Sequence, residues 1–178
     1  MMSPSTFLLA TLAMVTILVL HGVNATVVTT CKAAAESDKR VDYKFCVKEL
    51  GMHHDSPDAD IWGLAKVAAL VGAGNAENTL ADIRTMLAKP GMDIKTRLVL
   101  GQCLKLYDEV DDAFLNAYDK INNRDYVAGK KEVELATPLA RKCDDAFTSV
   151  AIPSAVNQSS RYTEQISIVC IAITNLIK

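Results

Sequence analysis

The segment "CLKLYDEVDDAFLNAYDKINNRDYVAGKKEVELATPLARKC", residues 103–143, lies across two apolar stripes that meet at one polar break. The break is the run Asn122–Asp125. On both sides of it, apolar residues recur in steps of three and four, which is the period of an α-helix with one buried face. The pattern predicts two consecutive helices that reverse direction at the break. The first stripe is Leu100, Cys103, Tyr107, Val110, Phe114, Ala117 and Ile121, and the second is Tyr126, Gly129, Val133, Ala136, Ala140, Cys143, Phe147 and Val150.

The cysteines at the two ends of this segment lie at equal distances from the middle of the break. In an antiparallel helical hairpin, residues equidistant from the turn lie at the same height, here ~30 Å along each arm at about 1.5 Å per residue. Cys103 and Cys143 are therefore predicted to face each other, as a disulfide requires. Cys31 and Cys46 repeat the arrangement around a polar centre and predict a small second hairpin. Cys170 lies on an apolar stripe and is predicted to be a buried free thiol.

Three further stretches complete the helical pattern. Apolar residues follow Pro57 at helical spacing as far as Leu87, and Pro57 suits the first turn of that helix. The run 72–74 (Gly-Ala-Gly) is expected to bend it, and Pro90 with the glycine after it should end it. Asp93 is the expected cap of the next helix.

The second half of the chain should hold one irregular helix, one loop and a last helix. Pro138 is expected to kink the helix that follows the polar break, because proline lacks the N–H group that a helix interior needs. Residues 151–160 are predicted to be a loop, and the last helix begins near Tyr162 and ends near Ile177. The fold class predicted is all-α: an antiparallel up-down four-helix bundle, preceded by a small N-terminal helical hairpin and held by two disulfides.

The N-terminus has the features of a targeting segment. Residues 1–25 contain no charged side chain, and Phe7–Leu20 is an apolar run. A membrane-spanning helix needs about 20 apolar residues, so this run fits the core of a secretory signal peptide better. Cleavage is predicted after Ala25, which leaves residues 26–178 as one secreted domain.

Charge and composition narrow the classes of partner. Lys and Arg number 19 and Asp and Glu number 21, a net charge of −2, with the basic residues scattered along the chain. The sequence has no basic cluster of the kind that binds nucleic acid, so a nucleic-acid partner is not expected. The apolar run Ile166–Ile177 is interrupted by polar residues, so it predicts a core helix rather than a membrane segment.

Catalytic and metal-binding motifs are missing from the sequence. There is no nucleophile elbow, phosphate-binding loop or paired C-x₂-C motif, so no enzyme activity, cofactor or metal site is predicted. His53, His54 and Asp55 could bind a metal or titrate, but adjacent histidines in a polar loop are usually solvated. Asn157, with Gln158 and Ser159, forms an N-glycosylation acceptor.

Acidic residues gather beside the two level cysteines. Because Cys103 and Cys143 are at one height, the carboxylates near them are predicted to lie on one side of the hairpin. Such a surface is either a solvated face or a docking face for a cationic cleft. The residues are Asp108, Glu109, Asp111, Asp112, Asp119, Asp125, Asp144 and Asp145.

Taken together, these features resemble the plant invertase and pectin methylesterase inhibitors. The resemblance covers essentially all of residues 27–178. It implies a secreted four-helix bundle with Cys31–Cys46 and Cys103–Cys143 disulfides. It also implies a non-enzymatic protein that blocks a carbohydrate-acting enzyme of the cell wall or vacuole one to one. The stretches that carry it are "YKFCVKEL" (43–50), "CLKLYDEVDDAF" (103–114), "RDY" (124–126), "CDDAF" (143–147) and "AITNL" (172–176).

The resemblance favours pectin methylesterase as the target, with acid invertase as the alternative. The family's esterase-binding positions match Glu109, Asp112, Asp125 and Asp145, whose carboxylates can imitate the polyanionic pectin chain. Lys142 departs from that pattern. Invertase inhibitors of the tobacco type carry Pro-Lys-Phe where this chain has Asp-Tyr-Val (125–127).

Two other interpretations remain open. The spacing between the first two cysteines resembles a subgroup of the family that is described as invertase inhibitors. A secreted structural bundle without an enzyme target is a second alternative, and the acidic residues beside the disulfide distinguish it from an inhibitor.

Overall fold

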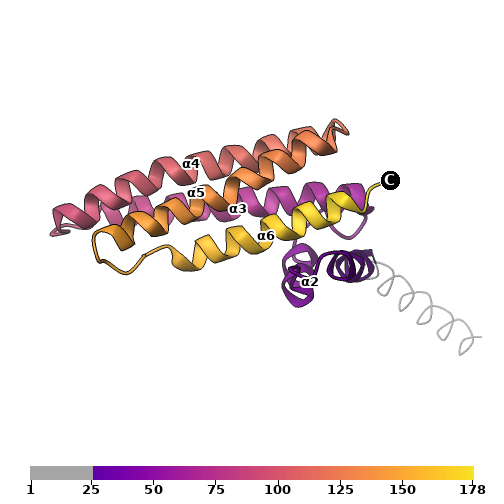
Figure 1. The fold of residues 1–178 in the computed structure, drawn as a ribbon, viewed down its shortest axis with the longest axis horizontal. Coiled ribbons are helices and arrows are strands. Elements are labelled where there is room, and N and C mark those ends of the chain that lie inside the picture. The colour runs from indigo at the N-terminus through magenta and orange to yellow at the C-terminus, as the bar shows by residue number, and fades with distance from the viewer. Residues whose placement is uncertain (1–25) are drawn as a thin grey trace, which may run out of the picture.

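The computed structural model describes residues 26–178, in which all regular secondary structure is α-helical. Four long helices run alternately up and down and form a bundle: α3 (Ile61–Leu87), α4 (Ile94–Asn122), α5 (Tyr126–Ser149) and α6 (Asn157–Asn175) (Figure 1). The short α2 (Tyr43–Gly51) and a helix over 26–37 lie beside this bundle. The predicted fold class is confirmed. The predicted signal peptide lies outside the described residues, and no helix in the described range could span a membrane.

The core lies where the apolar stripes predict it. α4 packs against α3 and α5, and α6 closes the ring against the same two helices. Tyr107, Phe114 and Phe147 are fully buried at the centre. Every residue of the predicted α4 stripe is buried, which confirms that stripe. Burial of this apolar surface is the main free-energy term that holds the helices together.

α3 begins four residues later than the proline predicts. The carboxylate of Asp60 accepts the Gly63 N–H at 2.7 Å, so Asp60 is the cap and Ile61 is the first helical residue. The preceding loop is held by Ser56, whose buried hydroxyl donates to the Leu50 carbonyl at 2.5 Å. The prediction that Pro57 lies in the first turn of α3 is therefore wrong. As the capping residue, Asp60 accepts a hydrogen bond from an N–H group that would otherwise be unpaired at the helix start. A proline side chain has no acceptor atom for this role.

α3 also runs without interruption through the glycines that were expected to bend it. Gly72 is packed so closely against the Phe114 ring that an added Cβ would come within 2.5 Å of the ring carbon Cδ1. The second glycine, Gly74, has no such neighbour within 4 Å. The absence of a side chain at Gly72 therefore allows α3 and α4 to approach each other closely.

The reversal between α4 and α5 takes only three residues. Arg124 adopts φ 65°, in the left-handed region, and its N–H donates to the Ile121 carbonyl at 3.0 Å. Asp125 then caps α5 by accepting the Ala128 N–H at 3.0 Å. α5 continues through Pro138 as one helix. So short a turn forces α4 and α5 to be antiparallel neighbours.

α6 begins at Asn157, one turn earlier than the polar run 151–160 predicts. The reason is Ser160, which is only 5% exposed and whose hydroxyl lies 3.0 Å from that of Tyr107. A serine looks like a loop residue in the sequence, but here its hydroxyl has a buried partner on α4. The prediction that residues 157–160 belong to the loop is therefore wrong.

Both predicted disulfides are present. Cys31–Cys46 joins the helix over 26–37 to α2, and Cys103–Cys143 joins α4 to α5. Cys170 is buried and forms no disulfide, and burial raises the pKa of its thiol to about 12. A thiol with so high a pKa remains protonated and unreactive near neutral pH.

The N-terminal hairpin contacts the bundle through α2. The ring of Phe45 packs edge-on against Tyr162 of α6, with 5.0 Å between centroids. The Tyr162 hydroxyl donates to Glu49 Oε2 at 2.6 Å, and Glu49 is only 8% exposed. Lys48 supplies the neighbouring positive charge at 2.8 Å from Glu49 Oε1. A mostly buried carboxylate thus keeps a hydrogen-bond donor and a counter-charge.

Candidate functional site

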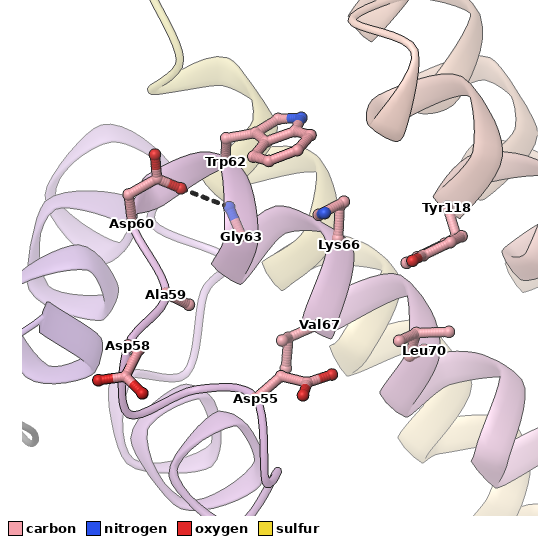
Figure 2. A pocket seen from close by; sticks show the side chains of 10 residues that line it. All are labelled: Asp55, Asp58, Ala59, Asp60, Trp62, Gly63, Lys66, Val67, Leu70 and Tyr118. Carbon is pink, nitrogen blue, oxygen red and sulfur yellow. Dashed lines mark hydrogen bonds between the residues drawn. The ribbon is translucent and has the colours of Figure 1, made fainter.

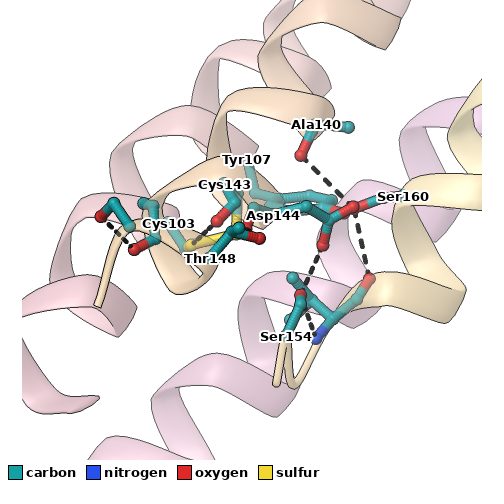
Figure 3. The surroundings of a disulfide bond; sticks show 11 residues. Cys103, Tyr107, Ala140, Cys143, Asp144, Thr148, Ser154 and Ser160 are labelled. Carbon is teal, nitrogen blue, oxygen red and sulfur yellow. Dashed lines mark hydrogen bonds between the residues drawn. A yellow bond between two sulfur atoms is a disulfide. The ribbon is translucent and has the colours of Figure 1, made fainter. Parts of the chain in front are cut away.

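The Cys103–Cys143 disulfide lies at a junction of three helices (Figure 3). One turn after Cys103, Tyr107 reaches across to α6, where its hydroxyl meets Ser160. The Ser160 hydroxyl is also 3.4 Å from the Ala140 carbonyl of α5. Burial raises the pKa of Tyr107 to about 12, so its hydroxyl remains neutral and acts as a structural link. The disulfide and this hydrogen-bond network together hold α4, α5 and α6 in one arrangement.

Asp144, next to the disulfide, is half-buried. Its carboxylate accepts a hydrogen bond from the Ser154 hydroxyl in the loop between α5 and α6 (Figure 3). The same hydroxyl accepts the Val156 N–H at 3.3 Å. Asp144 therefore anchors this loop, although the sequence grouped it with the docking carboxylates.

Asp111 turns in a different direction from its neighbours on α4. Its Oδ1 is buried and has no hydrogen-bond partner among the described residues. Burial raises the pKa of this carboxyl, and the negative charges of Glu77, Asp112 and Asp108 raise it further. Glu77 belongs to α3, so Asp111 lies toward the α3–α4 contact. The predicted single acidic cluster is therefore divided between the outer surface and this contact.

Replacing Asp111 with Asn should stabilise the protein near neutral pH. A carboxyl whose pKa is raised by folding destabilises the folded state above that pKa, and the penalty vanishes as the pH falls below the pKa of the unfolded chain. We expect a gain of about 0.5 kcal/mol at about pH 7 and almost none at about pH 3, because removing one like-charge repulsion has effects of this size. Urea unfolding at the two pH values measures it. A gain of equal size at both would contradict the assignment.

The four carboxylates that the sequence predicts to bind a partner are all exposed: Glu109, Asp112, Asp125 and Asp145. Glu109 and Asp112 lie three residues apart and so share one side of α4. Asp145 lies on the neighbouring α5, but Asp125 is at its other end, about 30 Å away at about 1.5 Å per residue. The four residues therefore mark a long strip along α4 and α5 rather than one compact patch.

Two further features qualify this strip. Asp125 caps α5, so its carboxylate already accepts a hydrogen bond within the protein. Lys105 and Lys142 are exposed on the same two helices. A partner that covers these two helices would therefore meet both signs of charge.

A second cluster, which the sequence did not predict, surrounds Trp62 at the other end of the hairpin. The indole N–H of Trp62 donates to the Ile121 carbonyl at 2.9 Å. Lys66 Nζ lies 3.7 Å from the centre of the indole ring, and the Arg124 guanidinium lies 4.3 Å from it. Lys66 also donates to Asn122 Oδ1 at 3.2 Å. The Arg124–Trp62 contact and the two hydrogen bonds join the start of α3 to the end of α4 and the α4–α5 turn.

A pocket of about 450 Å³ opens beside this cluster (Figure 2). Carboxylates of the loop before α3 line one side, and Trp62, Lys66 and Tyr118 line the other. The lining holds no serine, threonine, cysteine or histidine, so it contains no Ser–His or Cys–His pair. The only signal for this site in the sequence is the single tryptophan, whose partners are remote along the chain.

Comparison with known proteins gives consistent matches. Residues 25–173 match the plant invertase/pectin methylesterase inhibitor family. "Pectinesterase inhibitor 8" of rice (Oryza sativa subsp. japonica) is 51% identical over 160 residues, which cover 88% of this chain and 86% of the rice protein. "Pectinesterase inhibitor 12" of the same plant is 42% identical, over 88% of this chain and 76% of that protein.

The fold has a counterpart among solved structures. A crystal structure of a mutant form of a pectin methylesterase inhibitor from Arabidopsis superposes with a TM-score of 0.68. The superposition covers 83% of this chain and 97% of that one, at 20% sequence identity. At this identity the likeness concerns the fold alone.

Proposed function

Since the chain belongs to the plant invertase/pectin methylesterase inhibitor family, it is an enzyme inhibitor and not itself an enzyme, and we propose that its target is a pectin methylesterase. The observation that carries this choice is the 51% identity to a rice pectinesterase inhibitor over most of both chains. A second rice pectinesterase inhibitor, at 42% identity, supports the same choice.

The binding surface that we propose is the strip along α4 and α5. Glu109, Asp112 and Asp145 are exposed there, and the adjacent disulfide fixes the spacing between their helices. An esterase whose cleft accepts a polyanionic pectin chain presents positive potential, and exposed carboxylates on a rigid helix pair complement it. Inhibition then works by one-to-one occlusion of the cleft, with charge guiding the approach.

The proposal is tested by titrating the purified protein into pectin methylesterase and reversing one charge. Asp112→Lys should weaken inhibition about three- to tenfold, and more at low salt, because screening reduces the contribution of exposed charges. Asp125 is unsuitable for this test, since losing a helix cap costs about 1 kcal/mol by itself.

Asp82→Lys is the matched control, because Asp82 is also an exposed helical aspartate but lies on α3. It changes the net charge by the same amount and should leave inhibition nearly unchanged. An equal loss of inhibition in Asp112→Lys and Asp82→Lys would mean that only the net charge matters, and it would reject the strip as the binding surface. Failure of the unmodified protein to inhibit the esterase would reject the proposed target.

Acid invertase is the second candidate target, and one observation favours it. The first disulfide joins cysteines 15 residues apart, a spacing that resembles the invertase-inhibitor subgroup. The same titration against acid invertase distinguishes the two targets. Inhibition of invertase without inhibition of the esterase would select the alternative.

We also propose that the chain is secreted to the cell wall space and carries a glycan on Asn157. Asn157 is exposed as the first residue of α6, and the hydroxyl-bearing Ser159 follows within the same turn. Expression in plant cells should yield extracellular protein whose mass falls after enzymatic removal of N-glycans. Asn157→Gln should abolish that mass difference. Retention of the protein inside the cell would contradict secretion.

A further inference from the structure

The loop between α2 and α3 brings three metal-ligating side chains together. His53, His54 and Asp55 each place one donor atom within 4.8 Å of the others. Asp55 Oδ1 is 3.2 Å from His54 Nε2, and Asp55 Oδ2 is 3.9 Å from His53 Nδ1. The two imidazole rings stack with 4.6 Å between centroids. None of these three side chains belongs to the strip on α4 and α5.

The two imidazole–carboxylate separations are near those of a metal site. With metal–ligand bonds of about 2.0–2.2 Å, neighbouring ligand atoms of a tetrahedral site lie about 3.3–3.5 Å apart. Both carboxylate–imidazole distances are within a few tenths of an ångström of that range. The larger deviation is the 3.9 Å between His53 and Asp55, and rotation of the Asp55 side chain, which is 57% exposed, can reduce it.

The loop is also held in place before any ion binds. The hydroxyl of Ser56, which is only 1% exposed, donates to the Leu50 carbonyl, and the Ser56 N–H donates to the His53 carbonyl at 3.1 Å. The Asp55 N–H donates to His53 Nδ1 at 3.3 Å. In the ion-free loop this bond occupies the lone pair of Nδ1, so an ion bound at Nδ1 replaces the Asp55 N–H there. Because the backbone is already ordered, binding an ion would lose little conformational entropy.

We propose that His53, His54 and Asp55 form a binding site for a borderline divalent transition-metal ion, with zinc as the reference ion. Two imidazoles and one carboxylate suit zinc, copper or nickel, whereas calcium and magnesium prefer sites made of oxygen atoms alone. Three protein ligands leave a fourth position open to water or to a group from a partner. The site would fasten the connection between the N-terminal hairpin and the bundle.

The chain is well suited to a test, because its only other histidine is His21, in the N-terminal segment 1–25. Untagged, disulfide-bonded protein is titrated with zinc chloride in a calorimeter. We expect one zinc ion per chain. His54→Gln and Asp55→Asn should each weaken binding at least tenfold, while the control Asp82→Asn, a remote exposed carboxylate on α3, should not change it.

Three results would overturn the site. They are zinc affinity weaker than about 1 mM, zinc binding that survives His54→Gln, and calcium binding as tight as zinc binding. A second measurement distinguishes a variant that has lost a metal ligand from one that has lost its fold. Zinc should raise the thermal midpoint of the unmodified protein and not that of His54→Gln, because an ion that binds only the folded state stabilises it. In the presence of a chelator, His54→Gln and Asp55→Asn should unfold at the same thermal midpoint as the unmodified protein, since both altered side chains are exposed.

Discussion

Replacing Cys103 and Cys143 together with alanine should lower the free energy of unfolding by about 4 kcal/mol. The bond closes a loop with a sequence separation of 40 residues, and a cross-link of that length removes much of the entropy of the unfolded chain. For a domain of this size we expect the thermal midpoint to fall by about 8–16 °C. Guanidinium unfolding, followed by circular dichroism, measures the change.

The other disulfide supplies the comparison. Cys31 and Cys46 are 15 residues apart, so the same argument gives a loss of about 3 kcal/mol when both are replaced with alanine. The Cys103–Cys143 variant should also lose inhibition more than the Cys31–Cys46 variant does, because only the former bond joins the two helices of the proposed strip. A Cys103–Cys143 variant that kept its midpoint would show that packing alone sets the α4–α5 register.

Replacing Gly72 with alanine should destabilise the protein, whereas replacing Gly74 should not. A Cβ at position 72 would lie 2.5 Å from Cδ1 and 2.6 Å from Cζ of the Phe114 ring, which is fully buried and cannot turn away. Overpacking of this kind costs about 1–3 kcal/mol. Alanine regains up to about 1 kcal/mol through its better helix propensity, so a net loss of up to about 2 kcal/mol remains.

Gly74 is the matched control, two residues away on the same helix. No heavy atom lies within 4 Å of its added Cβ, so only the helix propensity changes, and Gly74→Ala should gain about 0.5–1 kcal/mol. Opposite signs in the two variants, measured by urea unfolding, identify the close contact of α3 and α4. A gain at both positions would mean that the Phe114 ring can move aside.

The stability of the α4–α5 pair bears directly on inhibition. Tyr107 and the disulfide fix three helices near Asp145, while Trp62 and Arg124 fix the turn near Asp125. A binding surface that is ordered before the partner arrives loses less entropy on association. A strip anchored at both ends therefore suits an inhibitor that must present fixed charges to a cleft.

Much of the fold follows from local patterns in the sequence. The helical period of the α4 and α5 stripes, the Asp93 cap and the short turn after Ile121 are properties of neighbouring residues, and all were predicted. Both disulfides were predicted as well, because an antiparallel hairpin converts equal sequence distances into equal heights. The start of α6 was missed, since the partner of Ser160 is Tyr107, on another helix.

The directions of the polar side chains depend on the packed bundle. Asp144 and Asp145 are adjacent in the chain, yet one is bonded to Ser154 and the other is exposed. Asp111 and Asp112 divide in the same way, because a side chain at the edge of a helix meets either solvent or the next helix. The helices themselves could be placed from the period of the apolar residues. Which carboxylates remain for a partner, and the Trp62 cluster, depend on contacts between residues far apart in the chain, which no local pattern encodes.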